Sequence, residues 1–440
     1  MRGKRTAGIG VAILLMYGAA AAQESLTLND AIARAQAYSA RLAELEARQA
    51  GAAAAEIGRH AVRMPIVTLQ AGYVRTNHVE EYAIAFPGQP LRVLYPDVPD
   101  NYRTRLDLQW PIYNGGRVQA LERAARAEKD AIAGDLSAAR ADLRLEVTRA
   151  FWALVTARET EEVVTRAVER MDAHVKDLRV RLDQGLIVPS DVTSAEAQRS
   201  RQQLLAIEAR NTRRVSEADL RRLTGLNGPI TPAPAGSMPA GGLTAARPSP
   251  DRTTTSGPVA ARAEREALGK RVDAARARED AARAGGKPQI SAVGGFDYAR
   301  PNPRIFPRAN AWDDSWDIGV NLTWTLWDGG RRKAEKAEAA AATRALQTRI
   351  TDFDRATAFE VEQRELELES ARAAITAAED GIRSAQETHR VLGERYRQGV
   401  ATNTEVLDAE IALLQAELDR TRAVAAARLA DARLERARGR

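Results

Sequence analysis

Four short segments of the chain alternate apolar and polar residues, the pattern of strands with one apolar face. The segments are 66–75, 104–113, 289–299 and 315–327. In the last of them the apolar series is Trp316, Ile318, Val320, Leu322, Trp324 and Leu326. Asp, Gly, Asn and Thr fill the positions between these residues. The alternation predicts four strands of about ten residues each.

Other parts of the chain repeat apolar residues at helical spacing. One set recurs at intervals of three and four residues, at Val168, Met171, Val175, Leu178 and Leu182. A second set has the same spacing, at Ile382, Ala385, His389, Leu392 and Tyr396. Such a seam is typical of packed helices of coiled-coil type. It predicts two long helical hairpins, over about 117–224 and about 331–430.

Helix boundaries can also be predicted. The first helix is expected to begin at Thr27, with Asp30 three residues later as its capping partner. Pro65 and Pro288 are each expected to end a helix and start a strand, because proline disrupts the interior of a helix and of a ladder.

Two motifs occur twice at one offset. WPIYNGGR at 110–117 returns as WTLWDGGR at 324–331, 214 residues later. RLDQGLIVPSDVTSAE at 181–196 returns at the same offset as RYRQGVATNTEVLDAE at 395–410. Two separate motifs at one offset indicate an internal duplication.

The duplication defines the predicted domains. Repeat 1 covers 23–224 and repeat 2 covers 258–440, each with two strands and one helical hairpin. Residues 225–257 are rich in Gly, Pro, Ser and Thr and are predicted to be an irregular connector.

The two octets mark a change of structure. Asn-Gly and Asp-Gly are hairpin signals, but Arg117 and Arg331 each open a long Ala/Glu/Arg-rich segment instead of a returning strand. Each octet is therefore predicted to be a strand-to-helix junction, with glycines supplying dihedral angles that other residues resist. The predicted junction residues are Trp110, Gly115, Gly116, Trp324, Gly329 and Gly330. The two tryptophans are expected on an outward face near a membrane boundary.

The N-terminus predicts export. Arg2, Lys4 and Arg5 precede a short apolar run at 8–22 that ends in small residues, which is typical of a signal peptide cleaved after Ala22. The alternative is a membrane anchor, for which this run is short. We expect the mature protein to be exported, and any membrane insertion to use strands.

The four strands allow two interpretations. They form either a small sheet packed on helices or transmembrane strands of roughly 9–11 residues. Tryptophan and tyrosine near the strand ends, and Asp, Asn, Arg and Gln on the opposite faces, favour the second interpretation. Four strands cannot close a barrel, and an open sheet edge does not persist in lipid. Several protomers must then share one barrel, and three would give twelve strands.

The composition and the motifs exclude several classes of function. The chain of 440 residues has no cysteine, which excludes disulfides and thiolate chemistry. Its 65 Lys and Arg against 59 Asp and Glu give a net charge of +6, spread along the chain, so nucleic acid is not an expected partner. The four histidines, His60, His78, His174 and His389, lack metal-ligand spacing. No nucleophile elbow, P-loop or dinucleotide motif occurs, so we expect no enzyme, no metal site and no cofactor.

LTLNDAIARA at 26–35, the two octets and the two paired turns together carry a family resemblance. The chain resembles the TolC-like outer-membrane efflux proteins over nearly all of its mature length. The resemblance implies a mostly α fold with β, in a homotrimer whose twelve-stranded β-barrel in the outer membrane continues into a periplasmic α-helical barrel. It also implies an export duct that works with a periplasmic adaptor and an inner-membrane exporter driven by protons or ATP.

The resemblance assigns roles to individual residues. Gly185, Leu186, Gly399 and Val400 match the hairpin tips where adaptors dock. Asp191, Tyr396, Glu405 and Asp408 match the residues of a periplasmic gate. Ala401 stands where some members have a gate arginine, so Arg395 or Arg397 would have to replace it. For Asp191 and Glu405, an interaction with a helix dipole is the competing explanation.

Several alternatives stay open at this point. A soluble periplasmic coiled-coil adaptor is the second hypothesis, and a general diffusion porin is the third. Within the duct hypothesis, the sequence does not separate efflux of drugs or metals from type I protein secretion. It does not identify the substrate, because substrate selection lies largely in the pump.

Overall fold

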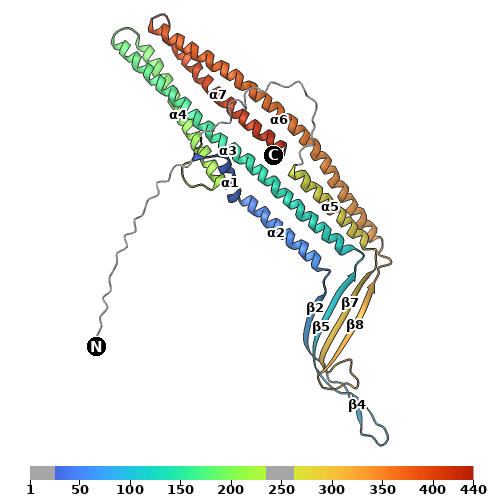
Figure 1. Cartoon of the computed structure of the whole chain (residues 1–440). Helices are drawn as coiled ribbons and strands as arrows, with labels where there is room; N and C mark the ends of the chain where they lie inside the picture. The colour runs from blue at the N-terminus through green and yellow to red at the C-terminus, as the bar shows by residue number, and fades with distance from the viewer. Residues whose placement is uncertain (1–24, 234–261, 440) are drawn as a thin grey trace, which may run out of the picture. The chain divides into compact units, whose positions relative to one another are not determined.

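The computed structural model describes residues 25–233 and 262–439 (Figure 1). These residues form two compact units. The hairpin unit comprises the described residues of 1–39, 143–255 and 364–434, and the sheet unit those of 40–142, 256–363 and 435–440. The expected signal peptide at 1–22 and the expected connector from residue 234 onward lie outside the described residues.

The first helix begins at a side-chain cap. The side-chain oxygen of Thr27 accepts a hydrogen bond from the backbone N–H of Asp30 at 3.2 Å, which confirms the predicted cap of helix α1 (Leu28–Tyr38). The helix does not run on toward Pro65. Ser39 takes an extended conformation with ψ 112°, and a second helix, α2 (Ala40–Ala61), follows. The break at Ser39 was not predicted from the sequence.

The long helices come in two pairs. Their bounds are α3 (Arg117–Asp183), α4 (Pro189–Thr224), α6 (Arg331–Arg397) and α7 (Asn403–Ala437). Both α3 and α6 have 67 residues, which corresponds to about 100 Å of helix. Helix α5 (Ala263–Ala284) precedes the strands of repeat 2 and was not predicted from the sequence. None of the described helices combines the length and hydrophobicity that a bilayer crossing requires.

The hairpin unit has its main core where α1, α3 and α4 meet. Ala31 and Ala35 pack against Phe151, Leu154 and Leu220, all of them buried. The start of the expected connector is not irregular throughout. Strand β6 (Thr231–Pro232) pairs in parallel with β1 (Ser25–Leu26) beside this core.

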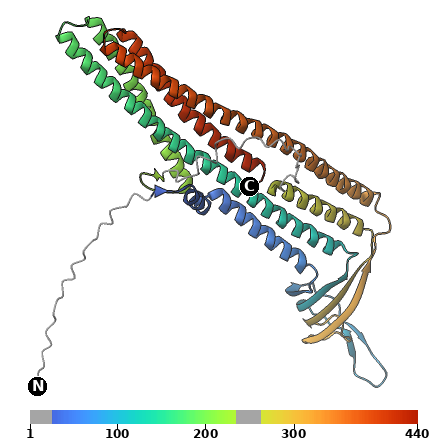
Figure 2. The ribbon, with the colours of Figure 1, turned by 45° about the horizontal axis from the view of Figure 1, so that its top comes forward.

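The sheet unit contains one antiparallel sheet of four strands in the order β2-β5-β7-β8. The strands are β2 (Ile66–Arg75), β5 (Asp100–Tyr113), β7 (Gln289–Arg300) and β8 (Asp313–Thr323). They lie side by side in Figures 1 and 2, and β5 and β7 join the two repeats. A separate small hairpin, β3 (Tyr82–Ile84) with β4 (Arg92–Tyr95), lies in the loop between β2 and β5.

One strand is shorter than expected. The alternation predicted a strand over 315–327, but β8 ends at Thr323, which pairs with Gln289, the first residue of β7. Beyond Thr323 the neighbouring strand offers no partner, because α5 and its turn precede Gln289. Trp324 and Leu326 are therefore outside the strand.

The sheet has one apolar face. The register places Leu69 opposite Leu106, Leu106 opposite Phe296, and Phe296 opposite Trp316, which makes one apolar row across all four strands. Within the single chain this face is uncovered, and Ile318 is 80% exposed. Such an apolar surface requires an apolar environment or a partner.

Candidate functional site

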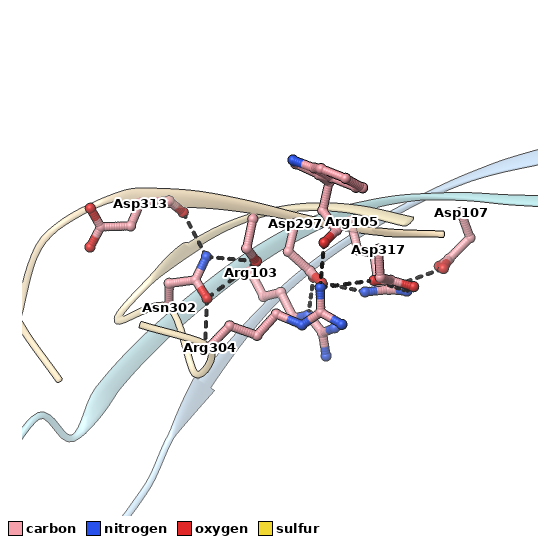
Figure 3. Close-up of polar contacts among 10 residues, drawn as sticks. Arg103, Arg105, Asp107, Asp297, Asn302, Arg304, Asp313 and Asp317 are labelled. Atoms are coloured by element: carbon pink, nitrogen blue, oxygen red, sulfur yellow. Dashed lines mark hydrogen bonds and ion pairs between the residues drawn. The ribbon is translucent and has the colours of Figure 1, made fainter. Parts of the chain in front are cut away.

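The opposite face of the sheet carries a cluster of charges (Figure 3). Arg105 donates from Nε to Asp107 Oδ1 at 2.6 Å and from Nη2 to Asp317 Oδ1 at 3.2 Å, and its Nη1 pairs with Asp297. Arg103 donates from Nε to Asp297 Oδ1 at 2.6 Å. Three strands thus contribute to one ion-pair network, and paired charges of this kind suit a hydrated surface.

Asp297 and Gly295, both close to Arg105, were not identified from the sequence. The Asp297 side chain is only 5% exposed and forms ion pairs with both Arg103 and Arg105. Its position among the polar residues of β7 was the one indication of this role in the sequence. Gly295 leaves the space that the Arg105 guanidinium fills, because a Cβ there would collide with that group. A glycine in a strand interior often marks such a close approach.

Each octet lies at the junction between a strand and the helix that follows it. β5 ends at Tyr113 and α3 begins at Arg117, while β8 ends at Thr323 and α6 begins at Arg331. The two octet tryptophans have equivalent contacts. Trp110 Nε1 donates to the backbone oxygen of Arg63 at 3.2 Å, and Trp324 Nε1 donates to that of Gly286 at 3.1 Å. Each bond ties the junction to the chain just before a strand-initiating proline.

All four junction glycines adopt the left-handed conformation. Gly115 and Gly329 have φ 67°, and Gly116 and Gly330 have φ 88° and 90°. This region is costly for residues with a Cβ. Gly115 is also crowded, because a Cβ there would lie 2.7 Å from Lys287 Cβ and 2.9 Å from the Ala284 carbonyl oxygen.

The Asn and Asp of the octets cap the helices that follow. Asn114 Oδ1 accepts from the backbone N–H of Val118 at 3.3 Å, and Asp328 Oδ2 accepts from that of Arg332 at 3.2 Å. This capping role was not predicted from the sequence. Both residue types are favoured N-caps, so their position just before a helix was the signal.

The two hairpin tips have the same local structure. Gly185 and Gly399 have φ 72° and 75°. The next residues, Leu186 and Val400, donate their backbone N–H to the carbonyls of Arg181 and Arg395, both at 2.9 Å. This is the Schellman arrangement that ends a helix on glycine. It leaves the Leu186 and Val400 side chains 67% and 62% exposed.

Tyr396 and Asp191 lie where the hairpins meet. The Tyr396 ring packs against the core of Met171, Val175 and Leu178, and the Arg181 guanidinium lies 5.0 Å from its centroid. The Tyr396 hydroxyl is buried and has no hydrogen-bond partner among the described residues, and burial raises its pKa. Asp191 lies in the first turn of α4, and its backbone oxygen accepts from Asn403 Nδ2 at 3.1 Å.

The acids Glu405 and Asp408 differ in their surroundings. Glu405 Oε2 accepts from the Thr402 backbone N–H at 2.7 Å and from the Thr402 hydroxyl at 2.9 Å. These bonds, the backbone one first, hold the pKa of Glu405 below its usual range. The pair forms a capping box for α7, so this carboxylate does serve its own helix end. Asp408 is exposed and makes no hydrogen bond or ion pair with any other described residue.

A buried acidic residue near the hairpin tips was not identified from the sequence. The Glu410 side chain is 4% exposed and accepts from Arg170 Nε at 2.9 Å, while His389 Nε2 lies 2.9 Å from its other oxygen. Arg170 also contacts Glu417 at 3.3 Å. Burial opposes the charged form of Glu410, but the bonds to His389 and Arg170 outweigh it, so its pKa is lowered. The network joins α3, α6 and α7.

Each of the four histidine side chains lies beside a polar group. His60, His78 and His389 lie beside the carboxylates of Glu122, Asp97 and Glu410, and His174 lies beside the amide of Asn403. Within residues 25–233 and 262–439, no group of three or more His, Asp or Glu side chains could hold a metal ion.

A duplicated chain of long helical hairpins, with one two-faced antiparallel sheet, is the fold of TolC-like outer-membrane channels. The family model described as outer membrane efflux protein matches residues 27–226 and 261–440. The chain belongs to this family. It is an outer-membrane protein with a periplasmic helical extension, and members of the family are channels rather than enzymes. The hypothesis of a soluble periplasmic adaptor was therefore wrong.

Similarity to individual proteins is low in sequence and high in fold. Protein CyaE of Bordetella pertussis is 26% identical over 309 residues, which is 69% of this chain but only 63% of CyaE. The outer membrane protein VceC of Vibrio cholerae has a TM-score of 0.76 at 22% identity, with 94% of this chain and 96% of VceC covered. CusC has a TM-score of 0.79 at 17% identity, with coverages of 94% and 92%.

Proposed function

We propose that three copies of this chain form an exit duct for export across the outer membrane. The three four-stranded sheets make a twelve-stranded barrel, and the hairpins continue it as an α-helical barrel in the periplasm. Members of the family work as trimers in tripartite efflux systems, which supports this assembly. The duct receives substrate from an inner-membrane exporter through a periplasmic adaptor.

The main support for the proposal is the sheet, which has one apolar face, one polar face and two edges that are unpaired among the described residues. One face is apolar and exposed, and the other holds the Arg105 network. Such a sheet matches lipid on one side and water on the other. Its outer strands, β2 and β8, have no partner on their free sides among the described residues, and lipid does not tolerate an open edge.

The tips supply the surfaces for the other components. Leu186 and Val400 present exposed apolar side chains on glycine-ended turns, which supports docking of an adaptor there. Asp408 faces solvent without a partner among the described residues of its own chain, which supports a place in a ring of three acids at a narrow entrance. A ring of like charges favours cations.

The entrance makes a measurable prediction. Wild-type protein in a planar bilayer should show low single-channel conductance with a preference for cations. The double variant Glu405→Gln and Asp408→Asn should conduct several-fold more and lose that preference, because it removes the acid ring and the charge of the α7 cap. Asp380→Asn, which alters an exposed acid of α6, is the matched control. A large open conductance in the wild type would contradict a closed entrance.

The substrate class depends on the partner pump. Export of small molecules and export of proteins both fit the duct, because selection lies largely in the pump. The genes flanking this one are the most direct discriminator: an ATP-driven exporter would indicate protein secretion, and a proton-driven pump would indicate efflux.

A further inference from the structure

Two loops join the strands at the end of the sheet that lies away from the helices. Loop 76–99 connects β2 with β5 and carries the small hairpin of β3 and β4, and loop 301–312 connects β7 with β8. At their other ends, β5 and β8 run on into α3 and α6. Because the helical extension of this family is periplasmic, both loops lie at the exterior end of the sheet (Figure 1).

The first residues of loop 301–312 fold over the polar face of the sheet. Asn302 Nδ2 donates to Ser315 Oγ at 3.1 Å. Ser315 shares its face of β8 with Asp317, a member of the ion-pair network. Asn302 is 2% exposed, and Ala299 on the same face of β7 is 1% exposed, so the polar face is covered at this level.

Arg304 holds this segment to β8 (Figure 3). Its backbone N–H donates to Asn302 Oδ1 at 2.9 Å, its Nη1 donates to the Trp316 backbone oxygen at 2.6 Å, and Nη1 also lies 3.4 Å from Asp317 Oδ1. The segment is therefore attached to an outer strand of the sheet through both side-chain and backbone groups.

Arg308 holds the other end of the segment. Its backbone N–H donates to the Leu94 carbonyl oxygen at 3.2 Å, and its guanidinium donates to the Tyr95 hydroxyl at 2.7 Å and to Asn101 Oδ1 at 3.2 Å. Leu94 and Tyr95 belong to β4, and Asn101 belongs to β5. Because β7 lies between β5 and β8 in the sheet, residues 304–308 cross the exterior end of β7.

Two apolar residues lie between these anchors. Ile305 and Phe306 are 38% and 73% exposed. The anchors join polar-face residues of two strands, Asp317 of β8 and Asn101 of β5, so the segment lies on the polar side of the sheet. In the proposed barrel, an aromatic side chain exposed on this side faces the lumen instead of lipid.

We propose that residues 301–308 form an exterior constriction of the duct, with Phe306 at its narrowest point. The proposal rests on the proposed trimer, in which the polar faces of three sheets line one lumen. A barrel of twelve strands, spaced ~4.8 Å apart and tilted by about 40°, is about 24 Å across between backbones. A segment packed on each third of the wall takes up much of the roughly 12 Å from wall to axis. Three copies of an apolar side chain then narrow the lumen and repel water.

The constriction is a separate barrier from the acids at the hairpin tips. Its anchors to β8 are hydrogen bonds and one partly exposed ion pair, in which the Arg304 side chain is 48% exposed. Such contacts are individually weak in water. A passing substrate can therefore displace the segment without unfolding the sheet, while large solutes outside the cell meet a closed path.

A cysteine in the lumen tests the constriction, because the chain has no cysteine of its own. Gln109 is exposed on the polar face of β5, four residues closer to the helices than Arg105. That spacing corresponds to about 13 Å along the strand, so a reagent from outside must pass residues 301–308 to reach it. Gln109→Cys is treated on intact cells with a small methanethiosulfonate and with a maleimide on a long polyethylene glycol chain.

The small reagent should label Gln109→Cys in every background, since the lumen holds water. The polymer should react slowly in the parent and about tenfold faster after Phe306→Ala, which widens the narrowest point. Asn302→Ala with Arg304→Ala should have the same effect, because it frees the segment from β8. This second variant leaves Phe306 in place, so it separates attachment from side-chain size.

Two controls use the other exterior loop. Phe86→Ala removes another exposed phenylalanine, which lies outside the anchored segment, and it should leave polymer labelling slow. Gln89→Cys, beside the turn of the small hairpin, should react quickly with the polymer in every background and gives the reference rate. The amount of heat-resistant trimer in each variant shows whether assembly is intact.

The outcomes separate the constriction from the proposed duct. Polymer labelling of Gln109→Cys as fast as that of Gln89→Cys in the parent would overturn the constriction and leave the duct standing. Slow labelling that neither variant accelerates would show that residues 301–308 are not the barrier. Failure of the small reagent at Gln109→Cys, in protein recovered from the outer membrane, would overturn the water-filled lumen and with it the duct.

Discussion

Replacing Gly115 with valine should abolish the proposed trimer in the outer membrane. The residue has φ 67°, a conformation that costs a residue with a Cβ about 1–2 kcal/mol and is more unfavourable for a β-branched one. Its Cβ would also lie 2.7 Å from Lys287 Cβ and 2.9 Å from the backbone oxygen of Ala284. Neither atom is the free end of a flexible side chain, so the backbone must shift, at about 1–3 kcal/mol more.

The measurement is the amount of heat-resistant trimer in purified outer membranes. Gly381→Val is the matched control, because Gly381 is an exposed helical glycine without a positive φ, and no described residue outside its own helix turn lies within 4 Å of its Cβ position. It should assemble nearly as well as the wild type. Normal amounts of trimer in the Gly115→Val variant would contradict the role assigned to Gly115 at the strand-to-helix junction.

Replacing Glu410 with glutamine should loosen the hairpin unit. The variant loses the negative charge that pairs with Arg170 and lies beside His389, and Arg170 then keeps only Glu417 among the described acids. Breaking a largely buried pair of this kind costs on the order of 2 kcal/mol, which corresponds to about 30-fold faster amide exchange. Hydrogen exchange in α6 and α7 near the tips measures it directly. Glu387→Gln, in an exposed pair with Arg390 on α6, should leave the exchange unchanged.

The same network predicts an effect of acid. The pKa of Glu410 in the fold lies below that of an unfolded glutamate, about 4.3. Its charge therefore stabilises the unit above that pH, and the stabilisation is lost as the pH falls through the lower folded pKa. Amide protection in α7 should drop below about pH 4 in the wild type and change much less in Glu410→Gln. Equal acid sensitivity of both proteins would exclude Glu410 as its source.

Several features could be predicted from the sequence because they depend on interactions between residues close together in the chain. The cap at Thr27 and the alternation of the strands depend on residues close together in the chain, so propensity and period suffice to find them. The duplication was equally visible, because the octets and the hairpin turns repeat as strings of letters. Asn114 and Asp328 belong to the same class, and their capping role was available from the rule that both residues favour N-caps.

Other features depend on residues far apart in the chain. Glu410 is one acid among 59 Asp and Glu residues, and only the packing of α3 and α6 around α7 gives it Arg170 and His389. The end of β8 at Thr323 followed from the start of its neighbour β7, although the alternation itself continued to Leu326. The break at Ser39 likewise lacked a signal such as proline or glycine.

The family, the repeat and the kinds of element can be read from the amino-acid sequence, because they follow from local pattern and from two motifs copied at one offset. Which charges pair across the sheet, and which copy of each repeated surface is covered, depends on the packing of elements that are distant in the chain. Gly115 and Gly329 have the same motif and the same φ, yet one is buried and the other is open. The reason is that burial depends on which element lies next to a residue in space, and two copies of one motif can have different neighbours.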